Sequence, residues 1–191
     1  MEPMIRGYSV KQQLDFLQTQ YEPSVSEQLL RRIPDDVRTS LSEIKPAEWY
    51  PRRYSVEMLR AIASHRGDDE QAVKDDLVRC GTFIATEASN TFLKILMKML
   101  TPALFAKKIP DFWRRDQKGG HIEVNTSEAG SGRMQLHLRD VEGFDHIAII
   151  SIGWMIFGMK AMGKADVQVT QNGWSLESPG PREVTYDLKW S

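Results

Sequence analysis

Residues 144–163 read Phe-Asp-His-Ile-Ala-Ile-Ile-Ser-Ile-Gly-Trp-Met-Ile-Phe-Gly-Met-Lys-Ala-Met-Gly, and this stretch decides the fold. From Ile147 to Met159 it carries no charged side chain. A helix that is apolar on every side has to be buried on every side. The run is also shorter than the roughly 20 apolar residues that cross a bilayer. The sequence therefore predicts the central helix of a soluble core, which starts near Asp145 and stops at Gly163.

The segments on either side of this helix alternate apolar and polar residues, as half-buried strands do. Two alternating runs, 122–125 and 133–139, predict a hairpin with one apolar face. After the helix, Asn172-Gly173 is a strong hairpin signal. The apolar positions of the strands around it are Val167, Val169, Trp174, Leu176, Val184, Tyr186, Leu188 and Trp190. This half of the chain predicts a β-β-α-β-β arrangement, an antiparallel sheet with the apolar helix against one face.

The first 118 residues show helical spacing instead. Capping boxes at Ser9-Val-Lys-Gln12 and Ser24-Val-Ser-Glu27 predict two helix starts, and Pro34 suits the first turn of a third helix. A fourth helix is predicted over 53–65 and a long one over 68–100, followed by a short helix from Thr101-Pro102 and a separate short turn or helix over 109–113. We expect an α+β fold, with residues 1–191 as a single domain made of a helical lobe (1–118) and a sheet-plus-helix lobe (119–191).

Composition narrows the function classes. The chain has 191 residues, 41% of them hydrophobic and 27% charged, with a net charge of −1. Such a chain has no basic field to attract nucleic acid. Cys80 is the single cysteine, so no intrachain disulfide can form. The N-terminus lacks the apolar segment of a signal peptide, and we expect a cytoplasmic protein without membrane insertion.

Residue types that carry chemistry are present without a catalytic pattern. The sequence contains no Gly-x-Ser-x-Gly, no His-Glu-x-x-His and no phosphate-binding glycine loop, so we expect no enzyme. Cys80 lies on the apolar stripe of the long helix, where a thiol is buried and inert. The acidic runs 35–36, 68–70 and 75–76 suit helix N-termini better than a metal ion. Of the four histidines, only His146 adjoins the central helix, in its first turn, where a capping or surface role is expected.

The order of features along nearly the whole chain resembles a known group of proteins. Ile5-Arg6-Gly7 leads into an amphipathic helix, Trp49-Tyr50-Pro51 precedes another, and a long helix containing Gly81 ends at the Pro102 turn. Pro110-Asp-Phe-Trp113, Gly119-Gly120, the Gly153-Trp154 helix and Lys189-Trp190 follow in that order. The chain is similar to a family of paralogous proteins of myxobacteria of about this length. It also resembles the superfamily of haem–nitric-oxide-binding domains, four-vinyl-reductase domains and TRAPP vesicle-tethering subunits.

This resemblance implies a regulatory domain with a ligand site. The haem-binding members carry a Tyr-x-Ser-x-Arg motif that this chain lacks, so we expect no cofactor and disfavour haem. Cys80 stands near the place where some tethering subunits are acylated, although a plain buried thiol fits the stripe better. We expect a non-catalytic sensor domain that binds a small apolar ligand between the long helix and the central helix. The predicted wall of this pocket is Ile84, Ala88, Leu96, Trp154, Met155 and Met159.

An alternative remains open at this stage. Met97, Met99, Met155, Met159 and Met162 fill irregular space, so the same residues suit a solid core. In that case the protein would be a dimerising scaffold, with a second copy or a signalling protein as its partner and no ligand.

Overall fold

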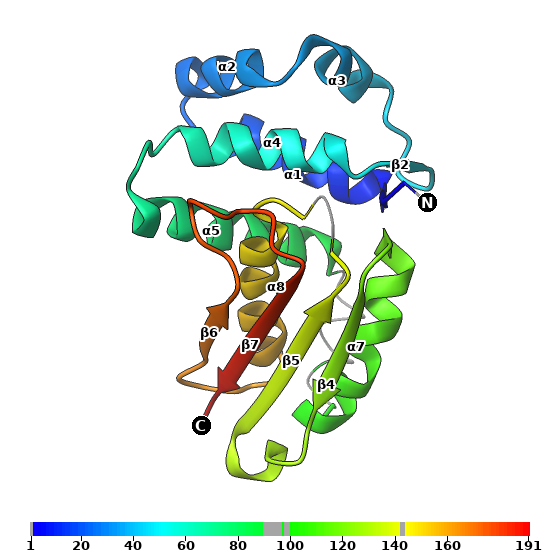
Figure 1. Ribbon diagram of the computed structural model, residues 1–191, viewed down its shortest axis with the longest axis vertical. Helices are drawn as coiled ribbons and strands as arrows, with labels where there is room; N and C mark the ends of the chain where they lie inside the picture. Colours follow the sequence, from blue (N-terminus) through cyan, green and yellow to red (C-terminus); the bar gives the residue numbers. More distant parts are fainter. Residues whose placement is uncertain (1, 90–96, 98–99, 142–143) are drawn as a thin grey trace.

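The computed structural model describes residues 2–89, 97, 100–141 and 144–191. It has the α+β architecture that the sequence predicts. Figure 1 shows a group of helices at one end and a large sheet at the other, with helix α8 (Ile147–Ala161) behind the sheet. Helix α7 (Pro102–Asp116) runs along the outer edge beside strand β4 (His121–Asn125).

The first helices lie close to the expected places. They are α1 (Gly7–Thr19), α2 (Pro23–Arg32), α3 (Asp35–Ser40), the 3₁₀ turn η1 (Leu41–Glu43) and α4 (Arg53–Ser64). The capping boxes predicted at Ser9 and Ser24 are both wrong, because α1 begins at Gly7 and α2 at Pro23, and neither start has a side-chain cap. The amides of Gly7 and Tyr8 donate to the carbonyls of Glu48 and Pro46, at 2.8 and 3.0 Å. Carbonyls of a distant loop therefore accept from the first amides of α1, where a side chain was expected to do so.

A small sheet joins segments that are far apart in the sequence. Strand β1 (Met4–Arg6) pairs antiparallel with β2 (Trp49–Pro51) on one side and with β3 (Gln117–Lys118) on the other. Sequence reasoning missed this sheet, since strands of two or three residues are too short to show alternation. Its consequence is that the N-terminus, the turn after η1 and the end of α7 lie together.

The long helix is shorter than predicted. Helix α5 (Glu70–Ala88) starts close to the predicted residue 68, and its N-cap is Asp69, whose side chain accepts from the Ala72 amide at 3.0 Å. It ends at Ser89, whose backbone is extended and whose hydroxyl donates to the Ala85 carbonyl at 2.7 Å. Such hydroxyl bonds compete with the helical ladder and favour helix ends. The rest of the predicted helix falls largely outside the described residues.

Helix α7 (Pro102–Asp116) is longer than predicted. Thr101 caps it as expected, by accepting from the Leu104 amide at 3.3 Å. The predicted break at 109–113 is wrong, since the helix continues through Pro110. A proline inside a helix loses one hydrogen bond. The turns after it are held by the Trp113 indole N–H, which donates to the Gly120 carbonyl at 3.2 Å.

The large sheet contains β4 (His121–Asn125), β5 (Arg133–Arg139), β6 (Gln168–Asn172) and β7 (Glu183–Lys189), in the order β4-β5-β7-β6. The predicted β4–β5 hairpin is confirmed, with Ile122 opposite Leu138 and Val124 opposite Leu136. The last strand lies inside the sheet, between β5 and β6. The tight turn predicted at Asn172-Gly173 is wrong. A loop over residues 173–182 replaces it and takes Trp174 and Leu176 out of the sheet.

Helix α8 (Ile147–Ala161) is the predicted central helix, and α5 and the large sheet bury it. The sheet turns its apolar side chains toward α8: Met134, Leu136, Leu138, Val184, Tyr186 and Leu188 are each at most 1% exposed. The Tyr186 hydroxyl donates to the Ala148 carbonyl at 2.8 Å, so even the polar tip of this ring is satisfied inside the core. Among the described residues, no helix has the length and apolar character to span a bilayer.

The predicted boundary between lobes, at residues 118 and 119, falls between the small sheet and the large one. Helix α7, which precedes this boundary, nevertheless packs chiefly on β4. The division into a single domain with two lobes stays a prediction.

Candidate functional site

Helices α5 and α8 approach each other closely at two glycines. A Cβ atom built on Gly153 would lie 2.5 Å from the Thr82 nitrogen and 2.8 Å from the Gly81 carbonyl carbon. One built on Gly81 would lie 2.8 Å from the Ile150 carbonyl carbon. These distances are shorter than a carbon atom tolerates, so backbone touches backbone here. The middle of the α5–α8 interface therefore holds no ligand.

The predicted pocket wall lies toward one end of this interface. Ile84, Met155 and Met159 are buried, whereas Ala88 and Trp154 are half-exposed. Leu96 lies outside the described residues. At the same end, Phe105 of α7 packs within 3.0 Å of the place where a Cβ on Gly158 would lie, and the Met97 methyl group is 3.7 Å from it. Three segments thus meet beside the predicted wall, which stays a prediction.

The opposite end of α8 carries a buried histidine. His146 is the N-cap residue, with a left-handed backbone (φ 55°, ψ −17°) that residues other than glycine seldom adopt. Its side chain is 5% exposed, and its Nδ1 atom has no hydrogen-bond partner among the described residues. The pKa of His146 is lowered to about 4, chiefly by burial; Asp145 raises it and Arg60 lowers it. The imidazole is therefore neutral at pH 7, the form in which histidine binds metals.

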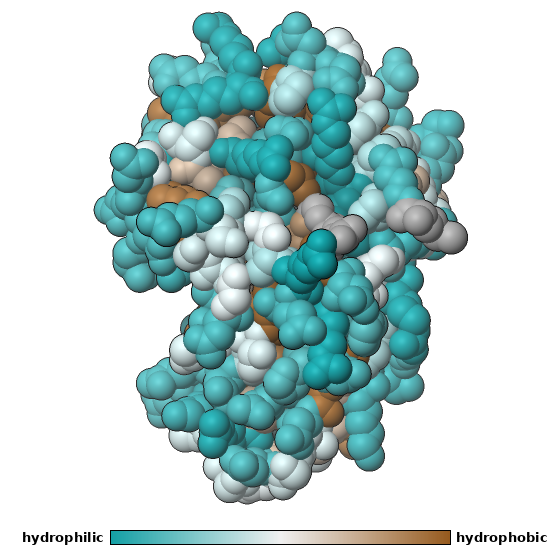
Figure 2. All heavy atoms as spheres, in the orientation of Figure 1, coloured by the Kyte–Doolittle hydropathy of each residue, from teal (hydrophilic) through white to brown (hydrophobic). Residues whose placement is uncertain are grey.

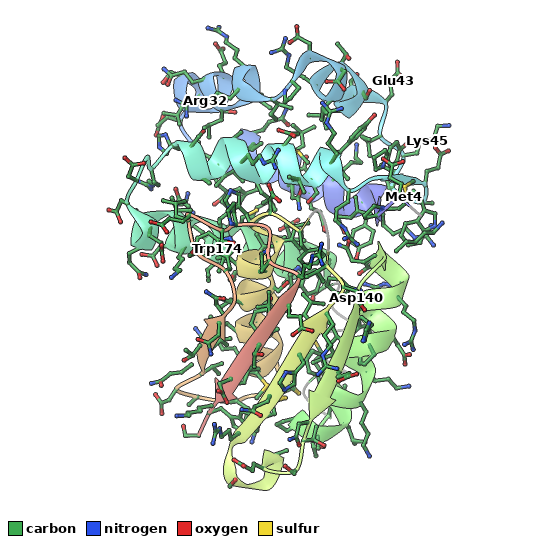
Figure 3. All side chains as sticks on the ribbon, viewed as in Figure 1. Met4, Arg32, Glu43, Lys45, Asp140 and Trp174 are labelled. Atoms are coloured by element: carbon green, nitrogen blue, oxygen red, sulfur yellow. The ribbon has the colours of Figure 1, made fainter. Side chains whose placement is uncertain are left out.

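The loop over residues 173–182 covers this histidine. The Trp174 ring meets the His146 ring edge-on, with centroids 5.9 Å apart, and its Nε1 atom is likewise buried without a partner. Figure 3 labels Trp174 where the loop meets α5. There Lys74 lies 5.4 Å from the indole centroid, and the Leu176 amide donates to Glu70 at 3.3 Å. Two neighbouring rings, each with a buried nitrogen that lacks a partner, mark a place where a hydrogen-bonding molecule would be accepted.

Charged side chains join the N-terminal helices to the region around α8. Arg60 of α4 binds the Asp145 carboxylate through two nitrogens, Nε at 2.8 Å and Nη2. Arg52, 2% exposed, donates to the carbonyls of Lys118 and Gly119 at 2.8 and 3.0 Å and stacks 4.8 Å from the centre of the Phe144 ring. Desolvation lowers the pKa of Arg52 to about 10, so it remains charged at pH 7. These contacts fix the His146 end of α8 against α4.

Sequence reasoning placed several of these residues differently. The surface or capping role expected for His146 is wrong, since its ring is buried and makes no capping hydrogen bond. Trp174 was expected in a strand, and Arg52 carried no signal because a lone arginine normally lies at the surface. Cys80 is fully buried as expected, and burial raises the pKa of its thiol. In the described part of the chain, no group of three or more His, Cys, Asp or Glu side chains could hold a metal ion.

Comparison with known proteins gives a match in structure alone. Neither protein-family models nor curated proteins match this sequence. Among solved structures, the Fe(II) unliganded H-NOX protein from K. algicida aligns with TM-score 0.72 at 9% identity, covering 98% of this chain and 97% of that one. The Fe(II)NO form of an H-NOX protein from S. oneidensis aligns with TM-score 0.69 at 12% identity, covering 98% and 99%. A third structure, described as a study of haem redox potential and protein-induced porphyrin distortion, aligns with TM-score 0.58 at 10% identity, covering 97% of this chain and 99% of that one. The chain therefore has the H-NOX fold over almost its whole length.

This comparison contradicts the prediction of no cofactor with haem disfavoured. Two of the solved structures that share the fold are Fe(II) H-NOX proteins, and a third is described by its haem. The missing Tyr-x-Ser-x-Arg motif therefore does not decide against haem.

The histidines of this chain can be compared with what a haem iron needs, which is an axial ligand such as a neutral imidazole. His65 and His121 are exposed, and His137 lies 3.4 Å from the Thr185 hydroxyl. His146 alone is both buried and unpartnered at a ring nitrogen. Its neutral imidazole is the nitrogen donor that would hold a haem iron, and in this structure the Trp174 ring packs against it.

Proposed function

We propose that this chain is a non-catalytic sensor domain that binds a small ligand beside α8. The observation that supports the proposal is the alignment with H-NOX structures from one end of the chain to the other. A fold by itself does not fix a function. The buried, unpartnered nitrogens of His146 and Trp174 add a feature of this chain that suits a ligand site.

The two ends of α8 suit two different ligands. His146 precedes the helix, and Met159 lies thirteen residues further on, so about 20 Å separate them at 1.5 Å per residue. A haem would use the His146 end, where the imidazole would hold the iron and the group would supply the site for a diatomic gas. An apolar molecule without a metal would use the other end, against Ile84, Ala88, Leu96, Trp154, Met155 and Met159. We propose haem as the first ligand to test.

The first experiment is native mass spectrometry and absorption spectroscopy of the protein purified from haem-supplied cells. A bound haem mass and a Soret band are expected, both lost in His146→Ala and both kept in His65→Ala, the matched control at an exposed histidine. If the band persists in His146→Ala, the ligand assignment is wrong. If no ligand mass is found, and neither haem nor a fluorescent fatty acid stabilises the protein, the sensor proposal itself is overturned.

A second experiment addresses the apolar end. Ala88→Trp would fill a cavity there and exclude a fluorescent fatty acid, with stability unchanged or raised. In a solid core the same substitution would cost about 1–3 kcal/mol through overpacking. Ala72→Trp, at another half-buried alanine of α5, is the control. Destabilisation of Ala88→Trp alone, together with absent fatty-acid binding by the parent, would favour a dimerising scaffold, which the oligomeric mass would then test.

A further inference from the structure

Helix α7 is poorly covered for a helix with so many apolar residues. Of its fifteen residues only Ala106 is buried. Among the large apolar side chains in the described residues, just two are classed as exposed, Leu104 at 51% and Phe112 at 37%, and both belong to α7. They lie about 12 Å apart along the helix axis, at 1.5 Å per residue. Single exposed apolar residues are ordinary, but their concentration on one helix is not.

The overall surface is mostly hydrophilic where Figure 2 shows it. On the face shown in Figure 2, hydrophilic side chains cover most of the protein, and apolar residues show only as small separate spots. Apolar side chains left exposed on one element of such a protein suggest a binding surface.

Positive charge surrounds the exposed face of α7. The cations are Arg6, Lys107, Lys108, Arg114, Arg115 and Lys118, and the carboxylates among them are Asp111 and Asp116. Asp111 is shared by Lys108 and Arg114, while Asp116 binds Arg115 through both oxygens. Within the described residues, no ion pair is formed by Arg6, Lys107 or Lys118. With Lys45 and Glu48, which pair with each other beside Trp49, the surface carries seven cations against three carboxylates, whereas the whole chain has a net charge of −1.

Contacts between side chains join the last turns of α7 to β1 and β2. The Arg6 Nε donates to the Arg115 carbonyl at 3.2 Å, which places β1 beside the last turn of α7. Arg115 in turn lies 5.7 Å from the Phe112 ring centroid and donates to the Tyr8 hydroxyl at 3.2 Å. Beyond Arg6, the Trp49 ring lies 4.0 Å from the Arg6 guanidinium carbon and 4.4 Å from the Lys118 ammonium.

We infer that this surface, from Leu104 through Phe112 to Trp49, docks an acidic amphipathic segment of a partner protein. The apolar side chains of such a segment would cover Leu104 and Phe112, and its carboxylates would lie against Arg6, Lys107 and Lys118. Arginine and aromatic side chains are enriched at the centres of protein interfaces. The inference does not depend on which ligand the protein binds.

Two other occupants fit less well. A second copy docked through the same face would bring the two sets of unpaired cations together, which like-charge repulsion opposes. An anionic bilayer would attract the cations, but Trp49 is half-buried between two of them rather than free to insert. A protein segment with its own carboxylates would neutralise the unpaired cations without requiring the Trp49 ring to leave its place between Arg6 and Lys118.

The probe is a synthetic helical peptide with leucines on one face and flanking glutamates, titrated against the full chain by fluorescence anisotropy. We expect saturable binding that weakens with added salt, since exposed charges are screened. Lys107→Glu with Lys118→Glu, and separately Leu104→Ser with Phe112→Ser, should each weaken binding about tenfold or more, on the order of 1.4 kcal/mol. These side chains are exposed at the surface, and far-ultraviolet circular dichroism would confirm that the variants fold.

The control variant is Arg31→Glu, which reverses an exposed cation on α2, at the other end of the molecule in Figure 1. It should bind as the parent does. A scrambled peptide with the same composition should bind at least about tenfold more weakly, on the order of 1.4 kcal/mol. No peptide binding, equal weakening by Arg31→Glu, or preferential binding to phosphatidylserine vesicles would each overturn the inference.

Discussion

Replacing Gly153 by alanine tests the central packing of the molecule. In an ordinary helix interior, alanine is more favourable than glycine by about 1 kcal/mol. Here the added methyl would lie 2.5 Å from the Thr82 nitrogen and 2.8 Å from the Gly81 carbonyl carbon. Both are backbone atoms, which cannot rotate away as a side chain can. Helices α5 and α8 would have to separate.

The magnitude follows from opposing effects. Overpacking in a core typically costs about 1–3 kcal/mol, and more where the neighbours cannot yield. Because the neighbours here are backbone, we expect about 3 kcal/mol, which the gain in helix propensity reduces to about 2 kcal/mol net. Separation would also loosen contacts of Leu77, Cys80 and Ile150, which are buried around the crossing. A loss of this size is a large part of a typical stability of about 5–15 kcal/mol.

The assay is urea unfolding followed by circular dichroism, with Gly130→Ala as the matched control. Gly130 has no atom within 4 Å of a built Cβ and no positive φ, so alanine there should leave the free energy of unfolding unchanged or slightly raised. The result that refutes the reasoning is a Gly153→Ala variant as stable as the parent. The two helices would then be further apart than described, with room for a ligand in the middle.

Three further outcomes are expected. Deletion of residues 184–191 should abolish cooperative melting, because it removes an inner strand with Tyr186 fully buried; an unchanged melt would show that β7 is dispensable. Burial lowers the pKa of His146 from 6.5 to about 4, so the unfolded chain binds the extra proton first. The free energy of unfolding should therefore decrease as the pH falls from 6.5 to about 4, and should not depend on this group above pH 6.5. In His146→Asn, where the new residue tolerates the left-handed backbone, this decrease with pH should be smaller. An equal decrease in the variant would assign the pH dependence to other groups. Burial raises the pKa of Cys80, so a disulfide reagent should modify it only as fast as the protein unfolds, and rapid labelling of the native state would contradict this.

Most of the fold was predictable because its core elements carry strong periodic signals. The charge-free run gave α8, and strict alternation gave β4, β5 and β7 with the correct inner face. The errors occurred where a distant segment overrides the local pattern. Gly7 starts its helix against the carbonyls of a loop forty residues away, and residues 173–182 leave the sheet so that Trp174 can bury against His146. The periodicity of a local segment cannot predict such contacts with distant residues.

The candidate site was less predictable, for a related reason. Ile84 was identified as buried from its spacing, and Met155 and Met159 from the charge-free run, but neither pattern can distinguish a filled interface from a pocket. His146 was given a surface role because the first turn of a helix is usually accessible. Its burial depends on a loop that comes more than twenty-five residues later in the chain. The haem prediction failed for a different reason, since it relied on one motif, and the fold match extends to a chain without that motif.

The close contact of Gly81 with Gly153 also constrains how this protein can bind anything. Because the middle of the α5–α8 interface is closed by backbone, a ligand at one end of α8 cannot extend to the other. A haem held by His146 would therefore lie beside α4 and the loop over 173–182, linked to α4 through Asp145 and Arg60. An apolar ligand near Met159 would instead lie beside Phe105, on the inner side of the helix that exposes Leu104 and Phe112. Identifying which end is occupied thus decides whether the docking surface on α7 is adjacent to the ligand or remote from it.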